Sequence, residues 1–183
     1  MKGCLLLSLA AVSACSPTPG LKTGPTMHPV RVVGAAGSTS LAVRQDDGMT
    51  SGLIAYSPDA VWSALPAVFD SLAIPVTRSD KADMILGTDG FRVRQRLARV
   101  PLSRYFDCGT TQVGPNADSY EVFLIVISRL KPAAAGTTTV EVSINARARP
   151  VAFSQAYSAC VDTGALDTRF RALLRAELAR RTP

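Results

Sequence analysis

The first fifteen residues constrain this chain most, because they decide which residues remain to fold. A short positive start, Met1-Lys2, precedes an apolar stretch from Gly3 to Ala11. That stretch is too short to span a bilayer as a permanent helix, and a basic start followed by a short apolar run is typical of a removable export signal. We therefore expect the folding unit to begin after this segment and to fold outside the cytoplasm.

The signal ends in Val12-Ser13-Ala14-Cys15, which resembles the lipobox of bacterial lipoproteins: a branched apolar residue, two small residues and a cysteine. The resemblance covers only this segment. It implies cleavage before Cys15, a diacylglycerol on the Cys15 thiol and a further acyl chain on the new amine. Two or more acyl chains hold a protein stably on a membrane, whereas one binds only marginally. The alternative is an ordinary secretory signal followed by an unmodified cysteine.

Residues 1–14 are thus expected to be a lipoprotein signal peptide, and the mature protein is expected to reach the membrane through lipid on Cys15. Ser16 follows the cysteine where some lipoproteins have Asp. In having Ser16 at this position, the chain resembles lipoproteins that are sent on to the outer membrane of Gram-negative bacteria. The expected location is the cell envelope, on the outer membrane and facing the periplasm.

Removal of the signal changes both the cysteine count and the charge. Cys4 is discarded and Cys15 is modified, so Cys108 and Cys160 remain of the four cysteines. In an exported protein two leftover cysteines are most simply a disulfide, here closing a loop of roughly 50 residues and contributing about 4 kcal/mol. The alternative is two buried free thiols. Loss of Lys2 leaves 19 basic and 14 acidic residues, a net charge of +5.

The rest of the chain divides by composition. Residues 15–29 carry four prolines and two glycines, which predicts an extended tether. Residues 30–49 are half apolar and broken by glycines, so they form an N-terminal arm or a pair of short strands. The globular domain is expected over residues 50–183.

Within that domain, local signals predict both helices and strands. Ser57-Pro58-Asp59 supplies an N-cap hydroxyl, a proline at the first helical position and an acid in the first turn. Apolar residues at helical spacing follow, and a second such pattern ends the chain. Apolar and polar residues alternate over residues 91–97, which predicts a strand. The patterns of residues 120–130 and 138–147 predict two long strands joined as an antiparallel hairpin. The two helical patterns comprise Val61, Leu65, Val68, Phe69 and Leu72, and Leu166, Phe170, Leu173, Leu174 and Leu178.

This order predicts an α+β fold: a two-layer sandwich in which an antiparallel sheet of about five to six strands packs against two helices. A strand leading through Ser57-Pro58-Asp59 into a helix with Val61-Trp62, then a meander and a closing helix, resembles helix-grip domains. It is similar in particular to BamC-like lipoproteins, accessory subunits of the outer-membrane barrel-assembly machine. The resemblance covers roughly residues 50–180. The chain departs from that family in having one such domain instead of two, and in its cysteine pair.

The sequence gives little support to a catalytic function. Asp162-Thr163-Gly164 is the signature of aspartic proteases, but only 19 residues follow Gly164 and they predict a helix, for which Asp162 and Thr163 are natural caps. His28, the only histidine, lies in the expected tether, so neither a metal site nor a Ser-His-Asp triad is predicted. Pairs of aspartates, Asp80 with Asp83 or Asp107 with Asp118, are not distinguished from turn residues. We expect no enzyme activity, metal or cofactor.

The arginines give a second candidate site. Arg92, Arg94 and Arg96 share one face of the strand expected over residues 91–97, and Arg147 and Arg149, two residues apart, share one face at the end of another strand. On neighbouring strands they would form a basic stripe able to bind phosphates or carboxylates bidentately. The alternative is a solvated sheet face, since 16 arginines against 4 lysines indicate a bias of the source genome. Nucleic acid is not an expected partner of an exported, anchored protein.

Together these patterns predict a non-enzymatic, lipid-anchored envelope lipoprotein that acts as an interaction or accessory module for other envelope proteins. The resemblance implies outer-membrane assembly as its specific role, and an exposed apolar groove is expected along the helix of residues 58–72. The alternative is a ligand-binding or inhibitor lipoprotein with the basic stripe, or with an apolar pocket lined by residues such as Trp62, Phe69 and Phe123. An enzyme would need a cleft with converging titratable groups.

Overall fold

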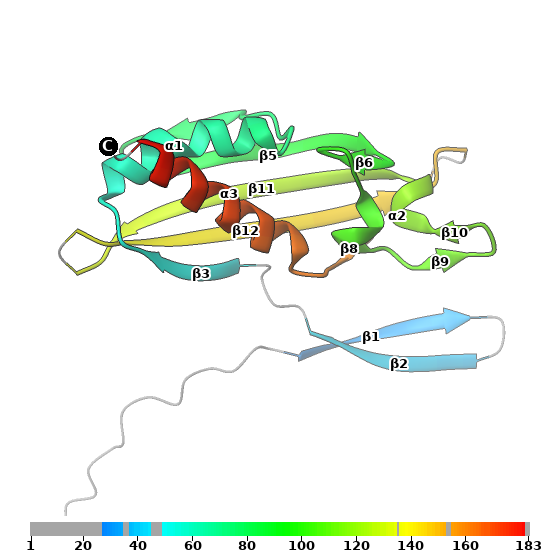
Figure 1. Cartoon of the computed structure of the whole chain (residues 1–183). Helices are drawn as coiled ribbons and strands as arrows, with labels where there is room; N and C mark the ends of the chain where they lie inside the picture. The colour runs from blue at the N-terminus through cyan, green and yellow to red at the C-terminus, as the bar shows by residue number, and fades with distance from the viewer. Residues whose placement is uncertain (1–26, 35–36, 45–48, 135, 153–154, 182–183) are drawn as a thin grey trace, which may run out of the picture. The chain divides into compact units, whose positions relative to one another are not determined.

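A computed structural model describes residues 27–34, 37–44, 49–134, 136–152 and 155–181 (Figure 1). Cys15 and the expected signal peptide lie outside these residues. Two compact units divide the chain, one up to Gln45 and one from Asp46. The first unit contains the antiparallel strands β1 (Met27–Gly34) and β2 (Gly37–Arg44). β1 therefore begins inside the segment expected as a tether, and His28 belongs to it.

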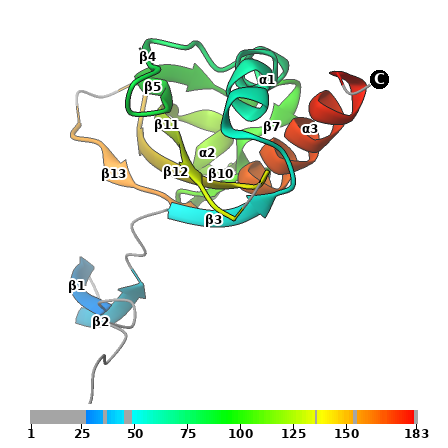
Figure 2. The same cartoon turned by 90° about the vertical axis from the view of Figure 1, so that its left-hand side faces the viewer.

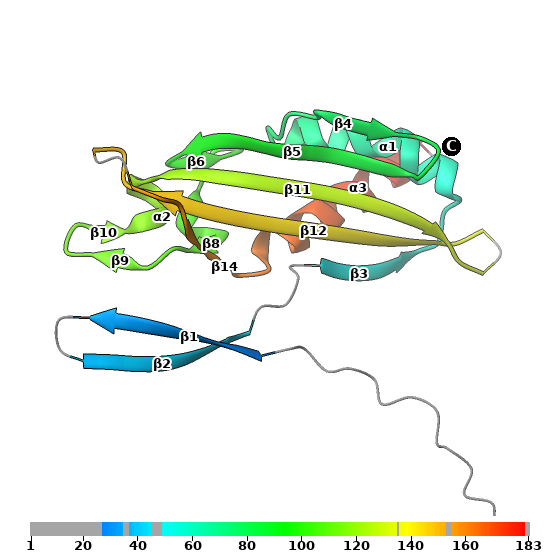
Figure 3. The same cartoon turned by 180° about the vertical axis from the view of Figure 1, so that it is seen from behind.

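The second unit is built on a six-stranded antiparallel sheet in the order β13-β12-β11-β5-β4, with β3 also paired to β12 (Figure 3). Its strands are β3 (Met49–Ile54), β4 (Arg78–Asp80), β5 (Ile85–Arg94), β11 (Glu121–Pro132), β12 (Thr138–Arg149) and β13 (Ser158–Ala159). β11 and β12 pair along their whole length, from Glu121 opposite Arg149 to Pro132 opposite Thr138. The long hairpin expected from the sequence is confirmed and is the centre of the sheet.

Two helices, α1 (Pro58–Ser71) and α3 (Ala165–Arg181), cover one face of this sheet (Figure 2). They bury the predicted apolar stripes, and the rings of Phe69 and Phe170 meet edge to face with centroids 5.6 Å apart. Alternate residues of β11 pack against the two helices: Val122, Leu124 and Val126 are each at most 1% exposed. The predicted fold class, an α+β sandwich of two layers, is confirmed.

The start of α1 follows its local signals. Ser57 is the N-cap, and its Oγ accepts a hydrogen bond from the Ala60 N–H at 3.3 Å. The exposed side of this helix carries Asp59, Ser63, Pro66 and Asp70. Three of these four residues are polar, but Trp62 beside them is half-buried and Pro66 is exposed. The apolar groove expected along residues 58–72 stays a prediction.

Short elements connect β5 to β11 and β12 to α3. They are β6 (Arg96–Leu97), β7 (Val100–Pro101), the 3-10 turn η1 (Leu102–Arg104), β8 (Phe106–Asp107), β9 (Thr110–Thr111), β10 (Gly114–Pro115), the short helix α2 (Asn116–Ser119) and β14 (Val161–Asp162). β6 pairs with β7, β9 with β10, and β8 with β14. These pairs close the end of the sandwich where β5 and β12 end.

A buried polar network fixes β3, the first strand of the second unit, to α3. Arg171 Nε donates to Asp167 Oδ2 at 2.9 Å, and their side chains are only 12% and 13% exposed. Thr50 Oγ1, on β3, donates to Asp167 Oδ1 at 2.7 Å, and Arg171 Nη2 donates to Thr50 Oγ1 at 3.0 Å. Since each charge has its partner and added hydrogen bonds, this pair avoids the cost of an isolated buried ion.

Candidate functional site

Within the described residues of the second unit, no helix covers the face of the sheet turned away from α1 and α3 (Figure 3). Along β11 and β12, residues with buried side chains alternate with residues that are half-buried or exposed. The buried set faces the helices, so the other set forms the open face. Because an antiparallel sheet tolerates one solvated face, this surface is available for binding without any change of fold.

Four arginines gather at one end of this open face. In the sheet register, Phe123 lies opposite Arg92 of β5 on one side and opposite Arg147 of β12 on the other. Glu121 likewise lies between Arg94 and Arg149. Directly opposed residues project from the same face and lie within contact of one another. We call Arg92, Arg94, Arg147 and Arg149 the arginine array.

Glu121 is the centre of this array. Arg149 donates to Glu121 Oε1 from Nε at 3.1 Å and from Nη2 at 2.9 Å, and the hydroxyl of Tyr157 donates to the same oxygen at 2.6 Å. Arg92 Nε lies 3.7 Å from it. One carboxylate thus orients two guanidinium groups and ties the segment after β12 back onto the sheet.

The hydrogen bond between Tyr157 and Glu121 shifts the pKa values of the two groups in opposite directions. The hydrogen bond from Tyr157 lowers the pKa of Glu121 below its usual range; Arg149 and Arg92 add to this, while burial partly opposes it. The same bond raises the pKa of Tyr157, since its proton is held by the carboxylate. At neutral pH the pair is therefore a charged carboxylate and a neutral phenol.

Aromatic rings complete the site. The Phe123 and Tyr157 rings lie with centroids 6.0 Å apart, and the Arg149 guanidinium lies 4.7 Å over the Tyr157 ring. Gly90 makes room for Phe123: a Cβ at this position would lie 2.1 Å from Phe123 Cζ, and its φ is +141°. Only glycine combines that backbone angle with such a close approach.

The array keeps positive charge in excess. Four guanidinium groups and one carboxylate leave a net charge of +3, and the Arg92 side chain is 66% exposed although it faces Glu121. Within the described part of the chain, Arg94 and Arg147 have no ion pair. Guanidinium groups in this arrangement can bind carboxylates or phosphates bidentately. Charge complementarity of this kind governs partner choice and the rate of encounter.

The structure brings together four of the five arginines expected to form the stripe. Arg92, Arg94, Arg147 and Arg149 share the array, but Arg96 does not. β5 ends at Arg94 because Gln95 has a φ of +64°, and Arg96 belongs to β6, where its Nη1 donates to the Arg99 carbonyl at 3.1 Å. The expectation that one strand runs over residues 91–97 is therefore wrong.

Sequence reasoning did not find the groups that organise the array. Glu121 belongs to no recognisable sequence motif. Tyr157 and Arg149 are so far from it along the chain that no local pattern predicts their contacts with it. Arg149 was expected in the stripe, but its bond to Glu121 was not. The expected apolar pocket lined by Trp62, Phe69 and Phe123 is also wrong, because Phe69 is a buried residue of α1 on one side of the sheet and Phe123 lies on the open face.

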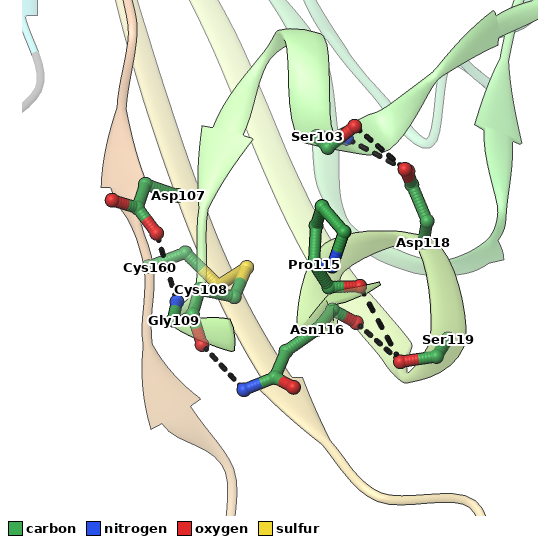
Figure 4. Close-up of a disulfide and its surroundings, with 9 residues drawn as sticks. All are labelled: Ser103, Asp107, Cys108, Gly109, Pro115, Asn116, Asp118, Ser119 and Cys160. Carbon is green, nitrogen blue, oxygen red and sulfur yellow. Dashed lines mark hydrogen bonds between the residues drawn. A yellow bond between two sulfur atoms is a disulfide. The ribbon is translucent and has the colours of Figure 1, made fainter. Parts of the chain in front are cut away.

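The two cysteines expected to form a disulfide lie together. Cys108 and Cys160 form a disulfide with an S–S distance of 2.09 Å and Cα atoms 4.3 Å apart (Figure 4). Asn116 Nδ2 donates to the Cys108 carbonyl at 3.1 Å, so the end of the β9–β10 hairpin is held beside the bond. The disulfide joins the connection between β8 and β9 to the segment between β13 and β14.

The aspartates considered for catalysis serve local structure. Asp107 accepts from the Gly109 N–H at 2.9 Å, whereas Asp118 accepts from the Ser103 hydroxyl at 2.6 Å, and Figure 4 shows the two carboxylates with these different partners. Asp80 Oδ1 accepts from two backbone N–H groups of its own turn. Over the described ranges, no three His, Cys, Asp or Glu residues are grouped closely enough to hold a metal ion.

The Asp162-Thr163-Gly164 segment is the entry to α3. Asp162 Oδ1 accepts from the Gly164 N–H at 2.9 Å, and Thr163 Oγ1 accepts from the Ala165 N–H at 3.3 Å. Burial raises the pKa of Asp162, and the nearby charge of Asp167 adds to the shift. These contacts are those of a helix start, as the capping interpretation predicted.

Fold and open face together define a two-layer α+β domain with a basic, helix-free sheet surface. No protein-family model matches the chain, and no curated protein matches it in sequence. Among the described residues, none of the helices has the length and apolar character needed to cross a bilayer.

Proposed function

We propose that the protein is a non-enzymatic, lipid-anchored accessory module of the bacterial cell envelope that binds an acidic partner protein through its helix-free sheet face. The observation that carries this proposal is the arginine array, with a net charge of +3 on an open face. Most apolar residues of both helices pack into the core, whereas this face carries the charged groups of the array. The lipobox-like Val12-Ser13-Ala14-Cys15 and the disulfide agree with an exported, anchored protein.

Photocrosslinking in intact cells tests where the partner binds. A photoreactive amino acid at Asn145, an exposed position on the open face, is expected to capture an envelope protein. The matched control carries the same group at Ser63, an exposed position on α1 in the other layer. Equal capture from both positions, or capture from neither, contradicts the proposal.

The array itself is tested by charge removal. Arg147→Gln with Arg94→Gln is expected to reduce capture at Asn145, because these guanidinium groups have no partner in the described structure and are free to pair with acidic groups. Arg175→Gln with Arg180→Gln removes the same charge from α3 and serves as the control. Copurification of barrel proteins with the captured complex tests the narrower role in outer-membrane assembly.

Anchoring is tested separately. Cys15→Ser is expected to move the protein out of the membrane fraction, since the acyl chains are the proposed attachment. A variant that remains in that fraction contradicts the lipobox interpretation.

A second candidate function rests on the same array. Four guanidinium groups can bind phosphate groups of envelope lipids directly, instead of a protein. Sedimentation with vesicles of anionic phospholipid, compared with zwitterionic vesicles, tests this for the Cys15→Ser protein. Binding that is lost in Arg147→Gln with Arg94→Gln would favour the lipid over the protein partner.

A further inference from the structure

A pocket of about 500 Å³ opens in the helix layer, where α1 ends and the turn between β6 and β7 meets α3. It is lined by Ser71, Ala73, Ala98, Arg99 and Arg169. Two of these five side chains are guanidinium groups, and neither has an ion pair among the described residues. The pocket therefore combines small side chains with uncompensated positive charge.

Arg169 is held in place by neutral groups. Its Nη1 donates to the hydroxyl of Tyr105 at 2.5 Å, and its Nη2 lies 3.5 Å from the Ala98 carbonyl oxygen. Tyr105 is only 2% exposed, so it is a fixed support. These bonds orient the guanidinium but leave its charge unbalanced, which favours an anion beside it.

The turn that carries Arg99 has an unusual sequence for its shape. Ala98 and Arg99 are the two residues between β6 and β7, and their φ angles are +47° and +69°. Positive φ at both central residues is the pattern of a type I′ hairpin turn, which favours Asn-Gly. Ala73, also in the lining, has a φ of +53° as the residue that ends α1, where the Ile74 N–H donates to the Phe69 carbonyl at 2.9 Å. The turn residues Ala98 and Arg99 have no such helix end to account for their angles, and strained non-glycine residues cluster at functional sites.

Each strained residue of the turn has a part in the pocket. Ala98 presents its carbonyl to Arg169, and Arg99 adds the second guanidinium to the lining. Arg96 Nη1 donates to the Arg99 carbonyl at 3.1 Å and so supports the turn. An Asn-Gly turn would relieve the strain but would remove the Arg99 side chain.

We propose that this pocket binds a small ligand with a carboxylate or phosphate group, held between Arg169 and Arg99. The remainder of the ligand lies against Ala73 and Ala98. The volume falls in the range of small-molecule sites, about 300 to 1,000 Å³. This site is separate from the arginine array and does not depend on the function proposed for it.

The test uses the full chain in neutral detergent at low salt, titrated with inorganic phosphate or with succinate by calorimetry. Saturable binding of one probe is expected, and the tighter probe identifies the class of anion. Arg99→Gln should weaken that binding about tenfold or more, equivalent to about 1.4 kcal/mol. Arg175→Gln, an equal charge change on α3 outside the lining, should leave it unchanged.

A second variant separates binding from folding. Ala98→Asn with Arg99→Gly gives the turn its preferred sequence, so it should raise the Tm of the free protein while abolishing the rise in Tm that the ligand causes. Three results would overturn the proposal: no saturable binding of either probe, equal weakening by Arg99→Gln and Arg175→Gln, or unchanged binding by the turn variant.

Discussion

Gly90 gives the most direct test of how the open face is built. Replacing Gly90 with Ala adds one methyl group at a backbone φ of +141°, where it would meet Phe123 Cζ, Cε1 and Cε2 at 2.1, 2.6 and 2.9 Å. None of these distances is compatible with a real Cβ, and the obstacle is a ring, which has no flexible end to move aside. The Phe123 ring must therefore leave its place between Arg92 and Arg147.

The cost has two parts. A non-glycine residue at such a positive φ costs on the order of 1–3 kcal/mol. Displacing Phe123 also breaks its contact with Tyr157, which is an aromatic pair of about 0.5–1.5 kcal/mol. We expect Gly90→Ala to lower the free energy of unfolding by about 2–4 kcal/mol, and the Tm by roughly 10 °C.

Urea unfolding followed by far-UV circular dichroism measures this loss. The double variant Gly90→Ala with Phe123→Ala is the control, because without the ring only the backbone strain remains. Gly90→Ala should then cost less in the Phe123→Ala background than in the wild type, by about 1 kcal/mol or more. A loss below about 0.5 kcal/mol, or equal losses in both backgrounds, would refute the reasoning.

Three further predictions concern the rest of the domain. Asp167→Ala leaves Arg171 buried without its counter-charge and should cost about 3–5 kcal/mol in urea unfolding, whereas a cost below about 1 kcal/mol would contradict the network between β3 and α3. Cys108→Ser with Cys160→Ser opens a loop whose ends are 52 residues apart and should lower stability by about 4 kcal/mol; an unchanged urea midpoint on reduction of the wild type would count against the bond. The folded state raises the pKa of Asp162 above the unfolded value of 3.8, so burial penalises the ionised carboxylate in the folded protein. The free energy of unfolding should therefore fall as pH rises through the folded pKa. Asp162→Asn keeps the acceptor for Gly164, so it should stabilise the protein at pH 7 relative to the wild type, with a smaller difference near pH 4; the opposite order would contradict the sign.

Much of the fold follows from local signals in the sequence. Ser57-Pro58-Asp59 begins α1, and the apolar residues at helical spacing bury the faces of both helices, because caps and periodicity act over a few residues. Alternation predicts the β11–β12 hairpin. The end of β5 could not be found this way, since the positive φ of Gln95 is uncommon for a glutamine and its carbonyl accepts from the Leu102 N–H, seven residues further along the chain.

By itself the sequence determined the candidate export signal, the pair of cysteines, the class of fold and the arginines at alternate positions of β5. Only the tertiary structure decided what these arginines surround. The register of three strands puts Arg92 and Arg147 beside Phe123, and a segment returning after β12 brings the Tyr157 hydroxyl to Glu121. The pocket at Arg99 and Arg169 likewise joins residues that are far apart in the chain. The reason is physical: helix caps and periodicity depend on neighbours along the chain, whereas charge balance and concave shape depend on neighbours in space.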